Sequence, residues 1–163
     1  MAASVFTLPI RPAKYDGLVA QPTYHAPEAA AQTYEKGALL ISSSGKVATA
    51  GADPALETLI GVANHNSTGT TDTDVEYIPA LPHITFEGTF SSGGTGVALL
   101  QSDLWVAYGV AVDATTKVWY VDKADTTNIR VVIVGFRDAV GTTDARVYFK
   151  FIPEATVYAP QVA

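Results

Sequence analysis

The sequence of 163 residues contains no cysteine. Disulfide frameworks, thiolate zinc sites, iron–sulfur clusters and cysteine nucleophiles are therefore excluded. Charge is sparse as well, since charged residues make up 16% of the chain against about 25% in an average soluble domain. With 48% hydrophobic residues and this length, the chain is expected to form one domain, with room for a small second lobe at most.

Basic charge is scarce: 10 Lys and Arg side chains face 16 Asp and Glu, for a formal net charge of -6. A protein that wraps nucleic acid or binds an anionic membrane surface needs a basic face, so neither partner is expected. Apolar runs are short, residues 131–134 among the longest, far below the roughly 18 residues that span a bilayer. The first residues lack a basic segment followed by a long apolar core, so no signal peptide is predicted.

Histidine is almost absent, with only His25, His65 and His83 in the chain. None of them stands three or four residues from another, as the ligands of a helical metal site do. Asp72 and Asp74 begin like a calcium loop, but the glycine and the distant glutamate of the EF-hand pattern are missing. We therefore expect neither a metal nor another cofactor.

Motifs of catalysis are also missing. Ser44-Gly45-Lys46 is similar to the end of a phosphate-binding loop, but Leu40 stands where the leading glycine belongs and Val47 where Ser or Thr belongs. No GxSxG nucleophile elbow occurs. Glu87 is expected to be a solvated residue on the polar face of a strand. No catalytic residue is assigned and the chain is predicted not to be an enzyme, with a hydrolase that uses dispersed acidic residues as the weakest alternative.

The N-terminal segment differs in composition from the rest. Because proline fixes φ and restrains the residue before it, helices and central strands are disfavoured where prolines cluster. We predict that residues 1–35 form an extended arm along a partner surface. The alternative is a strand and loop packed on the chain's own domain. Within the segment, Glu28–Lys36 is expected to form about two helical turns ended by Gly37. Four of the nine prolines lie in the segment: Pro9, Pro12, Pro22 and Pro27.

From residue 36 onward the pattern is that of an all-β domain. Short β-rich runs alternate with turns of Gly, Asp, Asn, Ser and Thr, and this spacing predicts antiparallel hairpins in a barrel or sandwich. The flexible-looking residues 91–96 divide the predicted domain, residues 36–163, into possible sub-lobes 36–90 and 97–163. Leu100, Leu104 and Tyr108 are spaced for one short helix. The expected strands lie within residues 38–42, 47–50, 59–64, 75–78, 84–90, 110–112, 118–121, 129–134 and 146–152.

Two strands show a period of two. In residues 84–90, Ile, Phe, Gly and Phe alternate with Thr85, Glu87 and Thr89, which predicts one buried and one wet face. In residues 146–152, we expect Val147, Phe149 and Phe151 inside and the alternating residues outside: Arg146, Tyr148 and Lys150.

The aromatic residues Trp105, Trp119 and Tyr120 allow two interpretations. Aromatic side chains bury large areas, and this makes core positions the favoured reading. The other reading is a platform on which sugar rings stack.

Several stretches resemble small head proteins of tailed bacteriophages. Residues 36–50 (KGALLISSSGKVATA) followed by 59–63 (LIGVA) are similar to a Gly-, Ile- and Ala-containing pattern of that group. Residues 109–122 (GVAVDATTKVWYVD), with 130–136 and 146–152, are similar to the C-terminal hairpins of capsid decoration or cement proteins. The resemblance covers residues 36–152, which is most of the chain.

The resemblance implies a non-enzymatic virion protein with a β-barrel, β-tulip or jelly-roll-like fold. Such a protein is made in the bacterial host cytoplasm and binds the outer surface of the expanded capsid. It joins neighbouring subunits of the major capsid protein as a small homo-oligomer, commonly a trimer. An N-terminal arm in related proteins orders on the capsid, sometimes as an added strand.

On this hypothesis, apolar and aromatic residues of the arm anchor it and two basic residues meet acidic rims of the capsid. A receptor- or carbohydrate-binding module of a head fibre or tail, using Trp105, is the competing hypothesis. The expected contact residues are Phe6, Leu8, Ile10, Arg11, Lys14, Tyr15 and Tyr24.

Overall fold

The computed structural model describes residues 8–17 and 20–158 and confirms the all-β prediction. This part of the chain contains no α-helix, only the single 3-10 turns η1 (Gln101–Asp103) and η2 (Pro153–Ala155). Accordingly, it has no helix of the length and apolarity needed to cross a membrane. The strands are β1 (Arg11–Tyr15), β2 (Tyr24–Pro27), β3 (Leu39–Ser43), β4 (Lys46–Thr49), β5 (Leu59–Ala63), β6 (Asp74–Pro79), β7 (Ile84–Ser91), β8 (Ala107–Val112), β9 (Trp119–Asp122), β10 (Val131–Phe136) and β11 (Arg146–Phe151).

The C-terminal strands form a closed barrel of five strands in the order β7-β11-β10-β8-β9. Closure comes from a short parallel pairing in which Phe90 and Ser91 of β7 meet β9, while the other pairs are antiparallel. The barrel interior is aromatic, because Phe86 of β7 packs against Phe149 and Phe151 of β11 with ring centres 6.1 and 5.1 Å apart. The alternating apolar residues of β7 and β11 supply this core, as the sequence predicts.

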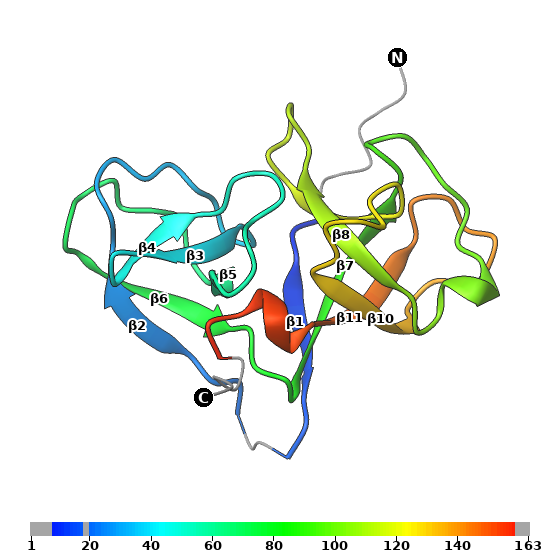
Figure 1. Cartoon of the computed structure of the whole chain (residues 1–163), viewed down its shortest axis with the longest axis horizontal. Coiled ribbons are helices and arrows are strands. Elements are labelled where there is room, and N and C mark those ends of the chain that lie inside the picture. Colours follow the sequence, from blue (N-terminus) through cyan, green and yellow to red (C-terminus); the bar gives the residue numbers. More distant parts are fainter. Residues whose placement is uncertain (1–7, 18–19, 159–163) are drawn as a thin grey trace.

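The remaining strands form a second, open antiparallel sheet in the order β2-β6-β5-β3-β4. Its two edges approach each other, since an isolated bridge joins Glu28, directly after β2, to Val47 of β4. Leu39, Leu40 and Leu59 of this sheet are fully buried. We call these two bodies the barrel and the open sheet, and they lie side by side in Figure 1.

The chain crosses between the two bodies three times. β1 belongs to the barrel and β2 to the open sheet, β6 is followed by β7 of the barrel, and η2 returns from β11 to the open sheet. On that return, Thr156 forms a parallel bridge with Leu59 of β5. The buried Arg130 donates from Nε to the carbonyl oxygen of Pro54, which adds a link between the bodies. The expected sub-lobes 36–90 and 97–163 differ from this division, because β7 pairs with barrel strands and residues 153–158 lie on the open sheet.

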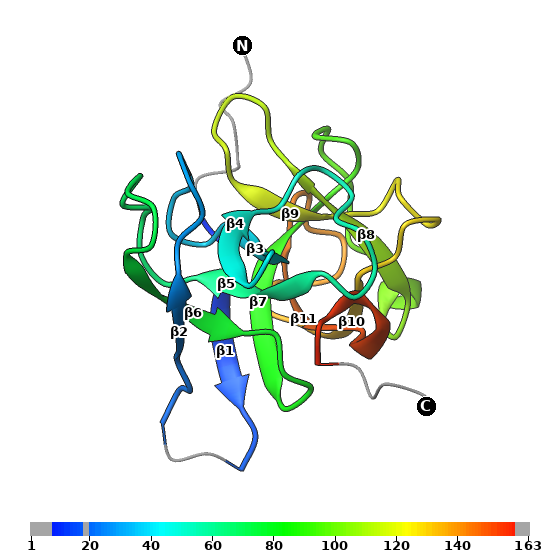
Figure 2. The ribbon, with the colours of Figure 1, turned by 60° about the vertical axis from the view of Figure 1, so that its left-hand side comes forward.

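The N-terminal segment is built into both bodies. β1 pairs with β7 from Arg11 to Tyr15, and β2 pairs with β6 from Tyr24 to Pro27 (Figure 2). Ile10 is 1% exposed and belongs to the core. For residues 8–17 and 20–35, the structure therefore shows the alternative to an arm along a partner surface, namely strands and loops packed on the chain's own domain. Pro12 and Pro27 lie in these two edge strands, where proline is tolerated because an edge strand leaves some N–H groups unpaired.

The predicted helix over Glu28–Lys36 is not formed. The carboxylate of Glu28 is fully buried and accepts the backbone N–H groups of Thr68 and Gly69 at 2.9 and 2.8 Å. The Tyr34 hydroxyl also donates to it, at 3.4 Å, and burial together with the Glu28 charge raises the pKa of Tyr34 to about 12. These contacts hold the segment against the loop before β6, and they outweigh the modest helix propensity of an alanine-rich run.

Replacement of Gly61 by alanine should destabilise the open sheet. A Cβ atom at Gly61 would lie 2.0 Å from the carbonyl oxygen of Ile78 in the paired strand β6, and such overpacking costs about 2 kcal/mol or more. Urea denaturation should show this loss for Gly61→Ala. Gly51→Ala is the matched control, since nothing lies within 4 Å of its Cβ position, and its change should stay within about 0.5 kcal/mol. Equal stability of the two variants would contradict the close approach of β5 and β6.

Candidate functional site

The polar face of β7 and β11 carries a buried ion cluster around Glu87. The Glu87 carboxylate is 5% exposed and accepts Nε of Arg146 at 2.9 Å. Arg137 and Arg11 also bond to it, the latter at 3.3 Å. Arg146 is in turn held by the carbonyl oxygens of residues 8 and 9, at 3.0 and 3.2 Å. One carboxylate therefore joins the N-terminal segment, β7, β11 and the residue after β10.

This cluster corrects two sequence expectations, a solvated Glu87 and an outward-facing Arg146. Both side chains do lie on the polar side of their strands, but residues 8–11 cover that side. Burial by itself would raise the pKa of Glu87, but the guanidinium groups of Arg146, Arg137 and Arg11 outweigh it and hold this pKa below its ordinary value. Glu87 is thus a charged, fully paired residue with a structural role.

A groove of about 510 Å³ lies on the same face of the barrel, next to the Glu87 cluster. Its charged side chains are partly neutralised, since Lys150 Nζ lies 3.3 Å from Asp16 and Lys14 Nζ lies 5.5 Å from the centre of the Tyr148 ring. Four neighbouring strands contribute to this wall, namely β1, β7, β11 and β10. The lining residues are Lys14, Asp16, Thr85, Trp105, Val134, Gly135, Tyr148 and Lys150.

Trp105 forms one border of this groove, and its indole is 68% exposed. Its backbone has φ +66°, a left-handed conformation that costs a bulky residue about 1–3 kcal/mol. The Trp105 N–H donates to the carbonyl oxygen of Ile133 at 2.9 Å, and this bond holds the strained residue against β10. The structure therefore stabilises an unfavourable backbone at the one tryptophan that it leaves in solvent, Trp119 being buried.

The turn before Trp105 is fixed by the buried carboxylate of Asp103. It accepts the Tyr108 hydroxyl at 2.8 Å, the Lys123 ammonium at 3.0 Å and the Leu100 N–H at 2.8 Å. Burial would raise the pKa of Asp103, but these three donors lower it below its ordinary value, whereas burial and the Asp103 charge raise the pKa of Tyr108. The expected helix from Leu100 to Tyr108 is replaced by this turn, η1 and the start of β8.

The sequence allows two interpretations for Trp105, Trp119 and Tyr120, and the structure assigns different environments to these residues. Trp119 and Tyr120 are buried, as core aromatics are. Trp105 is not. Sequence reasoning could not separate it from the others, because its exposure follows from the left-handed turn and from the Asp103 contacts, which join residues up to 20 positions apart.

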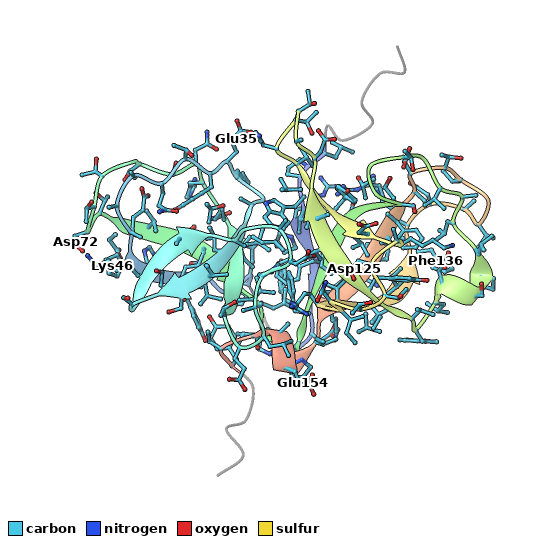
Figure 3. All side chains as sticks on the ribbon, turned by 45° about the horizontal axis from the view of Figure 1, so that its top comes forward. Glu35, Lys46, Asp72, Asp125, Phe136 and Glu154 are labelled. Carbon is cyan, nitrogen blue, oxygen red and sulfur yellow. The ribbon has the colours of Figure 1, made fainter. Side chains whose placement is uncertain are left out.

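Two further pairs of exposed apolar residues, one pair on each body, lie where backbone hydrogen bonds join neighbouring segments. Leu100 and Val140 form the barrel patch, where the backbone bonds Leu99 N–H to Thr142 O and Gly141 N–H to Leu99 O join the two loops. Leu56 and Val157 form the C-terminal patch. There, Val157 N–H bonds to Leu59 O and the neighbouring Glu57 N–H bonds to Glu154 O. Glu154 of η2 marks this second region in Figure 3.

The predicted contact residues do not form a single row. Lys14 borders the groove, Arg11 belongs to the Glu87 cluster and Tyr15 packs partly buried against the core. Leu8 is exposed, whereas Ile10 is a core residue. Phe6 lies outside the described residues.

Tyr24, the remaining predicted contact residue, is exposed on β2. It stacks edge-to-face with Tyr77 and Tyr158 at centroid distances of 6.1 and 6.3 Å. The Tyr158 hydroxyl donates to the carbonyl oxygen of Ile60 at 3.0 Å, which fixes this aromatic cluster to the open sheet.

Two histidines lie near carboxylates on the open sheet. His25 Nδ1 is 3.1 Å from Asp74, and the Nε2 atoms of His25 and His65 lie 3.6 and 3.5 Å from Glu76. Over residues 8–17 and 20–158, however, no three His, Asp or Glu side chains are grouped so that they could hold a metal ion. At the outer end of the same sheet, Lys46 and Asp72 form an ion pair at 2.6 Å (Figure 3).

Comparison of the chain with protein-family models, with curated proteins and with solved structures gives no match in any of the three.

Glu87→Gln should destabilise the protein by about 2 kcal/mol or more, because it leaves the buried guanidinium group of Arg146 without its anion. The stability that Glu87 contributes should decrease as the pH falls. Since folding lowers the pKa of Glu87, its contribution is fully present above the ordinary value of 4.5 and is lost as the pH falls through the lower folded value. Urea denaturation at several pH values below 5 should give a flatter stability curve for the variant. The exposed Glu154→Gln is the control, and a wild-type-like Glu87→Gln would contradict the structural role of the cluster.

Proposed function

We propose that this chain is a structural virion protein, which binds the outer surface of a tailed-phage capsid and joins neighbouring subunits of the major capsid protein. The observation that carries this proposal is the pair of apolar patches on two linked bodies. The barrel patch (Leu100, Val140) lies on one body, and the C-terminal patch (Leu56, Val157) lies on the other. A molecule with two separate adhesive surfaces at a fixed spacing is suited to bridge two neighbours.

Rigidity between the patches supports a bridging role. Three chain crossings, the Thr156–Leu59 bridge and the Arg130–Pro54 hydrogen bond join the two bodies. When no flexible hinge has to become ordered on binding, less conformational entropy is lost and the binding free energy is more favourable. The two patches therefore act as a preorganised pair.

The stretches that resemble phage head proteins support the same proposal. Residues 36–50 and 59–63 form β3, β4 and β5, the centre and one edge of the open sheet. Residues 109–122 contain the β8–β9 hairpin, and 130–136 with 146–152 contain the β10–β11 hairpin. The resemblance thus falls on the strands that build both bodies.

The physical effect of such binding follows from mass action. A protein that binds only the expanded shell stabilises it in proportion to the logarithm of its free concentration over Kd. An assembly of several copies, a homotrimer in this proposal, touches several capsid subunits, and each first contact raises the effective concentration for the next. The chain would act on the virion surface after synthesis in the bacterial cytoplasm, and no side chain is assigned a chemical step.

Co-sedimentation with expanded capsids that lack the protein tests the proposal. The full chain should bind and raise the temperature at which the capsids rupture. The double variants Leu56→Ser/Val157→Ser and Leu100→Ser/Val140→Ser should each bind at least about tenfold more weakly, because one of two linked contacts is lost. Sedimentation of the free protein measures the number of copies.

Thr115→Ser, at an exposed position of the β8–β9 loop, is the matched control and should bind like the unmodified chain. Absence of binding by the unmodified chain would reject capsid adhesion. Undiminished binding by both double variants would reject the two-patch bridge.

A further inference from the structure

The groove beside Trp105 has features that a bridging role does not require. Trp105 is held in a left-handed backbone conformation by its bond to Ile133, and the Asp103 contacts fix the turn before it. A residue without a side chain would adopt this φ without strain. A solvent-exposed indole in a strained, well-supported backbone indicates that the ring itself has a use.

Gly135 lines the groove and contributes no side chain to it. A Cβ atom there would lie 3.4 Å from Cδ2 of Tyr148, its partner in register on β11. β10 also has a register irregularity between Ile133 and Gly135, at the site where Trp105 is bonded. Bulges of this kind change the direction of side chains next to binding sites.

The polar groups of the groove include both hydrogen-bond donors and hydrogen-bond acceptors. Lys14 and Lys150 supply N–H donors, the Asp16 carboxylate accepts, and the Thr85 hydroxyl can do both. Lys150 and Asp16 already neutralise each other at 3.3 Å, and the chain carries a net charge of -6. A polyanion is therefore disfavoured, and the two ammonium groups disfavour a purely apolar segment. An uncharged ligand rich in hydroxyl groups, with one flat apolar face, matches both the ring and the polar wall.

The wall of the groove is also rigid. Tyr148 pairs in register with Glu87, the centre of the arginine cluster, and Lys14 pairs with Thr85 at the edge. A site whose side chains are positioned before binding loses less conformational entropy when the ligand arrives.

We propose that this groove binds a neutral oligosaccharide, with one sugar ring stacked on Trp105 and its hydroxyl groups bonded to Lys14, Asp16 and Lys150. The site is separate from the two apolar patches of the proposed function, since it shares none of their residues. It gives the protein a second binding activity, directed at a glycan.

Titration of the full chain with maltohexaose, cellohexaose, mannohexaose and chitohexaose tests the site by calorimetry and tryptophan fluorescence. At least one of these sugars should bind with Kd below about 1 mM and shift the emission of the exposed Trp105, because Trp119 is buried. Trp105→Gly should weaken binding at least about tenfold. It should leave the melting temperature unchanged or higher, since glycine accepts the left-handed backbone.

Thr115→Ser is the matched control, because Thr115 is exposed in the β8–β9 loop and does not line the groove. It should bind the sugar like the unmodified chain. The proposal is overturned if none of the four sugars binds, or if Trp105→Gly binds as well as the unmodified chain. It is also overturned if the Trp105 emission shifts with protein concentration alone, because a second copy of the chain would then cover the ring. The capsid assay uses different residues, so the two proposals can fail separately.

Discussion

The arrangement of the barrel face depends on the ion pairs between the Glu87 carboxylate and three arginine side chains. These pairs join Arg11 of β1, Arg137 after β10 and Arg146 of β11 to one strand, β7. A carboxylate at this depth is tolerated because guanidinium groups pair with it, and backbone carbonyl oxygens of residues 8 and 9 in turn hold Arg146. The cluster fixes β1 to β7, and the groove lies on the outer face that these strands form with β11 and β10.

The sequence predicts much of the fold because strand signals are local. Alternation in residues 84–90 and 146–152 and the turn residues between strands identify nearly every strand from β3 to β11, and they predict the aromatic interior around Phe86 and Phe149 correctly. The same alternation is misleading for Glu87 and Arg146. Alternation reports which side of a strand a residue takes, but whether that side is wet depends on the segment that covers it, and here the covering residues are more than 70 positions away along the chain.

The sequence predicts less of the candidate groove than of the fold. Its walls come from β1, β7, β11 and β10. The pairings of β7 with β1 and with β11 join strands far apart in the chain, and no local pattern reports them. The exposure of Trp105 depends on one left-handed residue and on the three donors to Asp103. The two apolar patches require only that Leu56, Val157, Leu100 and Val140 lie in turns, but for Leu100 the sequence predicts a short helix instead.

The position of β7 in the chain has a consequence for biosynthesis. β1 is made early, but its partner β7 leaves the ribosome about 70 residues later, and β7 completes its own pairing only with β9 and β11. Non-local pairing of this kind makes folding slow and leaves strand edges unpaired in the growing chain. All strands of the open sheet lie within residues 24–79, but the barrel cannot form before β11 (Arg146–Phe151) has been made. The two apolar patches are therefore set in their final spacing only on a nearly completed chain.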